Sequence, residues 1–112
     1  MKSYKYAQLD FGAYGVYLRS TDSQMLDWIL AELKKVITDF RVSEGPNLIT
    51  PSNLPSGERS LLHIDKLRDK DNQVGWWILK QLCLQGWEPF VVNYAESSRA
   101  FIYHFRLEDN AK

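Results

Sequence analysis

Residues 72–90 read NQVGWWILKQLCLQGWEPF and decide the fold of this chain. Apolar residues recur at helical spacing between Val74 and Leu84, so we expect a short helix with one broad apolar face. Gly86 stands just after the last apolar turn, where a glycine in the left-handed conformation ends a helix. Pro89 prevents the helix from resuming, and strand-forming residues follow it. The stretch predicts a helix, a glycine stop and an immediate strand.

Gly75 lies in the middle of the predicted apolar face. Glycine lowers helix propensity by about 1 kcal/mol relative to alanine, so its position requires a packing reason. We expect the helix backbone to approach a sheet closely at this residue. The two edges of the face are formed by Val74, Ile78 and Leu82 and by Trp76, Leu79 and Cys83.

Strand patterns surround this helix on both sides. Apolar residues alternate or run together in segments that are bounded by turn residues, as strands do. Gly12 and Gly15 flank a turn, so the first two segments are expected to form a hairpin, with one long strand bent at the glycines as the alternative. The predicted strands are residues 4–11, 14–18, 61–67, 90–94 and 100–107.

Another helix is predicted after the first two strands. Thr21 and Gln24 have the spacing of a capping box, in which a hydroxyl and a later glutamine satisfy free backbone N–H groups. The apolar stripe that follows has helical spacing, with charged residues on the opposite side. The stripe consists of Met25, Leu26, Ile29, Leu30, Leu33, Val36, Ile37 and Phe40.

Residues 41–58 show no periodic pattern and contain several prolines and glycines. Each proline pushes the residue before it toward extended geometry, so we expect a long loop. Residues 108–112 are polar and are expected to fray. The whole chain, 1–112, has the length of one domain.

The predicted order of elements is strand, strand, helix, strand, helix, strand, strand. Short turns between consecutive strands favour antiparallel pairing, and two amphipathic helices can cover one face of such a sheet. We therefore predict an α+β fold. It is a two-layer sandwich of a mainly antiparallel sheet of about five strands, with both helices on one face.

Composition and charge narrow the class of protein. The chain is 45% hydrophobic and 25% charged, and its 14 basic and 14 acidic side chains cancel. This balance lacks the positive charge of a typical nucleic-acid binder. No apolar run is long enough to span a membrane, and the first residues lack the apolar core of a signal peptide. Since the single Cys83 also fits a reducing compartment, we expect a cytoplasmic protein with neither membrane nor nucleic acid as a partner.

The end of the helix in the opening stretch combines a leucine-rich turn, a glycine and a Trp-Glu pair, formed by Leu79, Leu82, Gly86, Trp87 and Glu88. In this feature residues 60–107 resemble small bacterial domains of unknown function that are built as strand, helix, strand, strand. The resemblance implies the fold of this half of the chain. It implies no activity, cofactor or site residue.

His63, Asp65 and His104 are the candidates for a metal or catalytic site. His63 and Asp65 share one face of a strand, and His104 joins them if its strand is adjacent. Metal-ligand spacings such as HxxxH or CxxC are missing, so polar residues on a solvated strand are the favoured interpretation. Cys83 has no neighbouring base or cation in the sequence to activate it and is expected to be a buried structural thiol. We predict no enzyme, no metal site and no cofactor.

Aromatic residues outside the predicted core suggest binding. Trp28 lies on the charged side of its helix, and Trp77 and Leu84 lie on the polar side of the other. Tryptophan is common among the residues that anchor interfaces. The competing interpretation is that the long loop, through Leu48 or Ile49, or the other helix covers these rings within the molecule.

The uncovered face of the sheet is a second lead, because Tyr4, Tyr6, Tyr17, His63 and either Tyr103 or His104 are expected to share it. Rings on an open sheet can bind single-stranded RNA, but the basic surroundings are missing. A homodimer through this face, or a partner peptide added at an edge strand, explains the rings equally well.

We therefore expect a small soluble, non-catalytic interaction or regulatory domain that binds a protein partner or associates with itself. The alternative is a small-molecule-binding domain or minor enzyme in which residues 43–57 form a lid, and single-stranded RNA binding is the least favoured function. The predicted binding residues are Trp28, Trp77, Leu84, Tyr6, Tyr17, Leu48 and Ile49.

Overall fold

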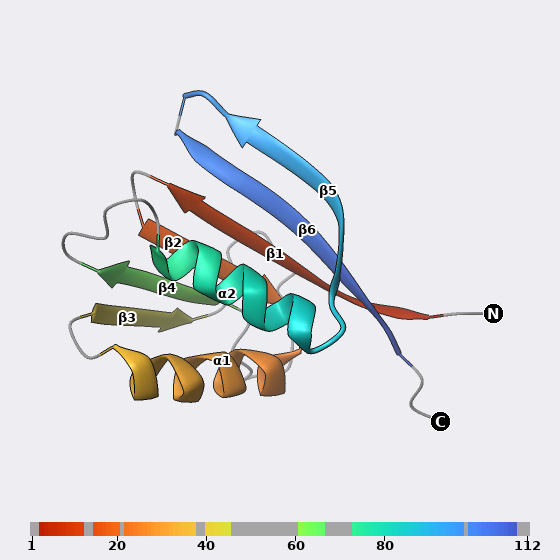
Figure 1. Cartoon of the computed structure of the whole chain (residues 1–112), viewed down its shortest axis with the longest axis horizontal. Helices are drawn as coiled ribbons and strands as arrows, with labels where there is room; N and C mark the ends of the chain where they lie inside the picture. The colour runs from red at the N-terminus through yellow and green to blue at the C-terminus, as the bar shows by residue number, and fades with distance from the viewer. Residues whose placement is uncertain are drawn as a thin grey trace.

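A computed structural model describes residues 3–12, 15–20, 22–37, 40–45, 61–66, 73–97 and 99–109. The elements are β1 (Tyr4–Gly12), β2 (Gly15–Ser20), α1 (Ser23–Val36), β3 (Phe40–Gly45), β4 (Leu61–Lys66), α2 (Gln73–Leu84), β5 (Glu88–Ala95) and β6 (Ala100–Glu108) (Figure 1). The strands form one antiparallel sheet in the order β3-β4-β2-β1-β6-β5. The predicted α+β fold with an antiparallel sheet and two helices is confirmed. The predicted number of strands is wrong, because the described sheet has 6 strands.

β3 is the strand that the sequence prediction missed. It occupies the start of the predicted 41–58 loop, so that prediction is wrong for residues 41–45, whereas residues 46–60 lie outside the described residues. Phe40 was assigned to the first helix because it continues the apolar stripe. The helix ends at Val36, and Phe40 and Val42 instead pack against the core from alternate positions of a strand that pairs with β4.

α1 begins one residue later than the capping-box pattern predicts. Asp22 is the N-cap, and its carboxylate accepts a hydrogen bond from the Met25 N–H at 3.3 Å. A carboxylate suits this position because it satisfies a free N–H group and faces the positive end of the helix dipole. The predicted apolar stripe is buried as far as Leu33, whereas Val36 in the last turn is exposed.

Both helices cover the same face of the sheet. Leu9 and Phe11 of β1 lie opposite Leu18 and Val16 of β2, and all four side chains are buried. They form one hydrophobic cluster with the buried residues of α1 and α2, which lie on one side of the strands in Figure 1. The far half of the β5–β6 hairpin extends beyond α2, so its sheet faces are not covered by a helix (Figure 1).

The C-terminal end of α2 is closed by a Schellman motif, as its sequence predicts. Gly86 adopts a φ of 94°, its N–H donates to the Cys83 carbonyl at 3.1 Å, and the Trp87 N–H donates to the Leu82 carbonyl at 3.0 Å. These two bonds satisfy carbonyl groups that the end of a helix leaves free. The turn at Gly86 thereby places the Trp87 ring in the core, directly before β5 begins.

Gly86→Ala is expected to destabilise the fold by about 1 kcal/mol, because a side chain disfavours a positive φ. A Cβ at this position makes only an ordinary contact, 3.4 Å from Leu107 Cδ1. The expected loss of stability therefore comes from the backbone conformation and not from a steric clash. Urea denaturation measures it, and Gly86→Asn is the control, since asparagine tolerates the left-handed region better. Equal losses for both variants would contradict this explanation.

The last strand runs further than predicted. Glu108 pairs with Tyr4 as part of β6, and the Asp109 N–H donates to the Ser3 carbonyl at 2.9 Å. Fraying is therefore wrong for Glu108, because pairing with β1 continues to the start of that strand. Residues 110–112 lie outside the described residues.

Candidate functional site

β5 is an edge strand with an apolar and exposed surface. It lies at the end of the sheet and pairs with β6 along its length. Apart from Ala95, each of its residues is exposed, with 44% for Phe90, 39% for Val91, 53% for Val92 and 52% for Tyr94. We call these four side chains the β5 edge patch. An edge strand of this kind is a template for pairing with another chain.

The two ends of β5 differ in how they are protected. Pro89 has no N–H to donate, and the pairing with β6 shifts between Pro89 and Val91 at an irregularity around Phe90. Proline and bulges are the usual means of blocking an edge. Between Val91 and Ala95 the strand contains neither, and it carries no charged side chain. The second half of β5 is therefore an edge without these two means of protection.

An aromatic cluster continues the β5 edge patch on the side of the sheet that carries the helices. Tyr94 lies edge-on to Phe101, with 5.1 Å between the ring centroids. Phe101 lies 5.7 Å from Phe11 and 5.7 Å from Trp76, which also contacts Tyr103. Trp76, predicted to lie at an edge of the buried face, is exposed on one side while it packs on Phe11 at 4.9 Å. The apolar surface thus runs from the sheet edge toward the start of α2.

A second group of rings lies on the open face of the sheet. The Phe90 ring lies 6.2 Å from Tyr6 and 6.3 Å from His104. Arg106 Cζ lies 5.0 Å from the centroid of the Tyr4 ring and 5.6 Å from that of Phe90. Stacking of a guanidinium on aromatic faces holds both groups in place. The β5 edge patch is therefore supported from both faces of the sheet.

Arg106 also forms a salt bridge to the start of β5. Its Nε donates to Glu88 Oε2 at 3.3 Å, and this hydrogen bond raises the pKa of the Arg106 guanidinium above its usual value. Arginine is protonated in any case at physiological pH. The pair joins β5 to β6 at the end of the strand where Pro89 interrupts pairing.

Three polar side chains of the open face, those of Gln8, Asp10 and Arg19, are joined to one another. Asp10 accepts hydrogen bonds from Gln8 Nε2 at 2.9 Å and from Arg19 Nη1 at 3.1 Å. The guanidinium of Arg19 lies 5.3 Å from the centroid of the Tyr17 ring. Tyr6 and Tyr17 thus both lie on the open face as predicted, and the register places His104 there too, whereas Tyr103 contacts Phe11 and Trp76 on the helix side.

The structure separates the two tryptophans that were predicted as binding residues from the β5 edge patch. Trp28 and Trp77 are partly buried and pack against the core. Leu84 is exposed at the end of α2, and Cys83 beside it is exposed as well, so the predicted buried thiol is wrong. Cys83 and Leu84 are exposed because the buried face of α2 is narrower than the predicted apolar face. It consists of Val74, Gly75, Ile78 and Leu82. Leu48 and Ile49 lie outside the described residues.

The predicted binding residues did not include the exposed Phe90, Val91, Val92 and Tyr94. Their sequence reads as an apolar run that only Asn93 interrupts, which is typical of a strand buried on both faces. The signal that was available is Pro89, because proline within a strand is confined to edges and bulges.

The condition under which His104 would join His63 and Asp65, adjacent strands, is not met. His104 lies on β6 and His63 on β4, and β2 and β1 lie between these strands. At about 4.8 Å for each strand spacing, the two backbones are separated by roughly 14 Å. Among the described residues, no group of three or more His, Cys, Asp and Glu side chains could hold a metal ion.

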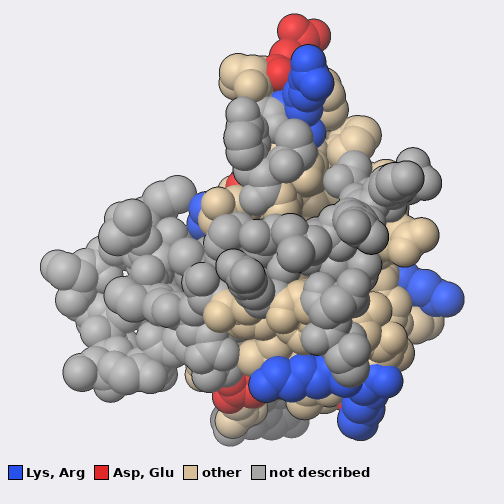
Figure 2. All heavy atoms as spheres, turned by 90° about the vertical axis from the view of Figure 1, so that its left-hand side faces the viewer, with Lys and Arg blue, Asp and Glu red and all other residues tan. Residues whose placement is uncertain are grey.

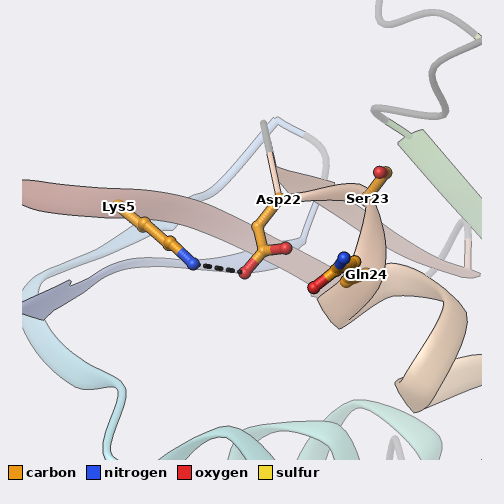
Figure 3. A pocket seen from close by; sticks show the side chains of 4 residues that line it. All are labelled: Lys5, Asp22, Ser23 and Gln24. Carbon is orange, nitrogen blue, oxygen red and sulfur yellow. Dashed lines mark ion pairs between the residues drawn. The ribbon is translucent and has the colours of Figure 1, made fainter. Parts of the chain in front are cut away.

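A polar hollow of about 310 Å³ lies where α1 begins, lined by Lys5, Asp22, Ser23 and Gln24 (Figure 3). Lys5 Nζ lies 3.5 Å from Asp22 Oδ2, and Asp22 Oδ1 accepts the N-cap hydrogen bond from Met25. The Asp22 carboxylate therefore forms both the salt bridge with Lys5 and the hydrogen bond that caps the helix. The hollow is explained by the start of the helix and indicates no ligand.

Charge is dispersed on the side of the molecule that Figure 2 shows. The described basic side chains lie at several separate places there, and at the tip of the β5–β6 hairpin basic and acidic groups occur together. Neither α1 nor α2 is long and apolar enough to cross a membrane. Comparisons with protein families, curated proteins and solved structures find no match to this chain.

Proposed function

We propose that this chain is a non-catalytic protein-interaction domain that binds an extended segment of a protein along β5. The observation that carries the proposal is the exposed, uncharged edge between Val91 and Ala95. Backbone N–H and C=O groups of an edge strand give affinity to an added strand, and alternating side chains give specificity. We also propose that the domain acts in the cytoplasm, where an exposed thiol such as Cys83 stays reduced.

This proposal moves the binding surface from the tryptophans to the β5 edge patch. Trp28 and Trp77 contribute to the core and are proposed to act mainly in stability. Tyr6 contacts the Phe90 ring and is proposed to support the surface from the open face. Leu84 remains exposed at the end of α2 and is not part of the β5 edge patch.

Val92→Lys is expected to weaken binding by about tenfold, because a lysine at the edge must lose water before another strand can pair. The probe is a fluorescent peptide selected from a random library of short peptides for binding to the domain, and anisotropy measures its affinity. Val36→Lys is the matched control, since Val36 is 58% exposed on α1 and Val92 is 53% exposed on β5.

The selected peptides are expected to be rich in β-branched and aromatic residues. The proposal is wrong if Val92→Lys and Val36→Lys bind the selected peptides equally well. It is also wrong if the library yields no binder and the domain remains monomeric at high concentration.

A further inference from the structure

We infer that the segment received by β5 is β5 of a second copy of this chain, paired antiparallel about a two-fold axis that passes beside Asn93. The inference rests on the proposed function and names its partner. Two sheets joined in this way form one continuous sheet across the dimer. Two observations support it: the register that the charges permit and the fit of the side chains. The exposed area then sets the expected strength.

The charges at the two ends of β5 select the register. In an antiparallel pair of identical strands, a two-fold axis places one residue opposite its own copy. An axis at Val92 places Glu88 opposite Glu96 of the other copy, and like charges directly opposite are destabilising. An axis at Tyr94 places Glu96 opposite Val92 of the other copy and brings a carboxylate onto the apolar edge. An axis at Asn93 avoids the like-charge pair and keeps Val91 to Ala95 opposite one another. Glu96 then lies opposite Phe90 of the other copy, at the end of the contact where the pairing of β5 is irregular.

The side chains fit this register. Val92 lies opposite Tyr94 of the second copy on the helix side, and the symmetry repeats this pair. A β-branched residue opposite an aromatic residue is a favourable cross-strand pair. Val91 lies opposite Ala95 on the open side, where the small alanine leaves space for the nearby Phe90 ring. The helix side of the joined sheet is therefore apolar at the contact. On the open side the uncharged Asn93 lies opposite its own copy, between the two Val91–Ala95 pairs.

The exposed area sets the expected strength. Phe90 is 44% exposed and Tyr94 is 52% exposed. At about 200 Å² for each large side chain, the two rings expose roughly 200 Å² together. A stable interface buries about 800 Å² on each partner. With the two valines and the strand backbone added, the edge remains below that value, so the dimer is expected to dissociate on dilution through the micromolar range.

Disulfide trapping tests the partner and the register together. In a Cys83→Ser background, Asn93→Cys places two thiols on directly opposite residues, whose Cα atoms lie about 4.5–5.5 Å apart in an antiparallel pair. That separation suits a disulfide. We expect covalent dimers from Asn93→Cys at concentrations where sedimentation shows a dimer. Val36→Cys in the same background measures random collision and is expected to give far less. A mixture of Val92→Cys and Tyr94→Cys chains is expected to crosslink as a heterodimer more than either chain does alone.

The outcomes separate this inference from the proposed function. A monomer at all concentrations, with peptide binding that is lost in Val92→Lys, overturns the second copy as partner and leaves the edge as a binding surface. A dimer that is trapped better through Val92→Cys alone than through Asn93→Cys overturns the register. A dimer that is insensitive to Val92→Lys overturns the inference, and peptide binding that is equally insensitive overturns the proposed function as well.

Discussion

Gly75→Ala is expected to destabilise the domain by about 2 kcal/mol, although alanine is the better helix former. A Cβ built on Gly75 overlaps Cγ and Cδ2 of Phe11 and lies 2.7 Å from its Cβ. Phe11 is only 1% exposed, and its ring is packed against Trp76 and Phe101, so it has little room to move. Overpacking of this kind costs up to about 3 kcal/mol, and the gain in helix propensity returns about 1 kcal/mol.

Urea denaturation followed by circular dichroism measures this effect. Lys80→Ala, at an exposed position of the same helix, is the control and is expected to change stability little. In a Phe11→Ala background the penalty of alanine at Gly75 is expected to fall by about 1 kcal/mol, because alanine lacks the Cγ and Cδ2 atoms that the new Cβ overlaps. A penalty that stays the same without these atoms would show that the contact with Phe11 is not its cause.

The same glycine shows which parts of the fold could be predicted from the sequence. Gly75 in an apolar stripe indicates a close approach to a sheet, and the structure has that approach at Phe11. The end of α2 was predictable for a similar reason, since a glycine after the last apolar turn and a following tryptophan are local signals. Both features depend on residues that are near each other in the sequence or on one helix face.

β3 and the order of the strands were not predictable in this way. Phe40 fits a helical stripe and a strand equally well, and pairing with β4, from Leu61 onward, decides between them. β3 and β4 are far apart in the sequence, so no local pattern predicts that they pair. The pairing of β6 with β1, which leaves β5 at the edge of the sheet, likewise joins the two ends of the chain.

The candidate site was only partly predictable because exposure depends on strand order. The run from Phe90 to Tyr94 has the composition of a central strand, and it becomes an exposed surface only because β5 lies at the edge. Tyr6 and Tyr17 could be assigned to the open face, since alternation along a strand needs no knowledge of its neighbours. The place of Trp77 on the polar side of its helix did not show that the ring packs partly against the core.

Trp87→Ala is expected to destabilise the domain by about 3–5 kcal/mol, the largest effect of the substitutions proposed for this chain. Trp87 is 4% exposed and belongs to the hydrophobic cluster that α1, α2 and the sheet share. Its backbone N–H also closes α2, but alanine keeps that hydrogen bond to Leu82. The loss therefore measures the burial of the ring and the cavity that its removal leaves.

Trp77→Ala and Trp28→Ala provide the comparison, because both rings are only partly buried against the same cluster. Each is expected to lose roughly half as much stability as Trp87→Ala, since the loss follows the apolar area removed from water. Circular dichroism is the suitable measurement, because each substitution also changes the tryptophan fluorescence. If Trp77→Ala or Trp28→Ala were as stable as the unaltered chain, the ring would contribute little to the core, and its role as a binding residue would again become the better explanation. If both variants lose as much stability as Trp87→Ala, the buried area of each ring does not determine how strongly that ring stabilises the fold.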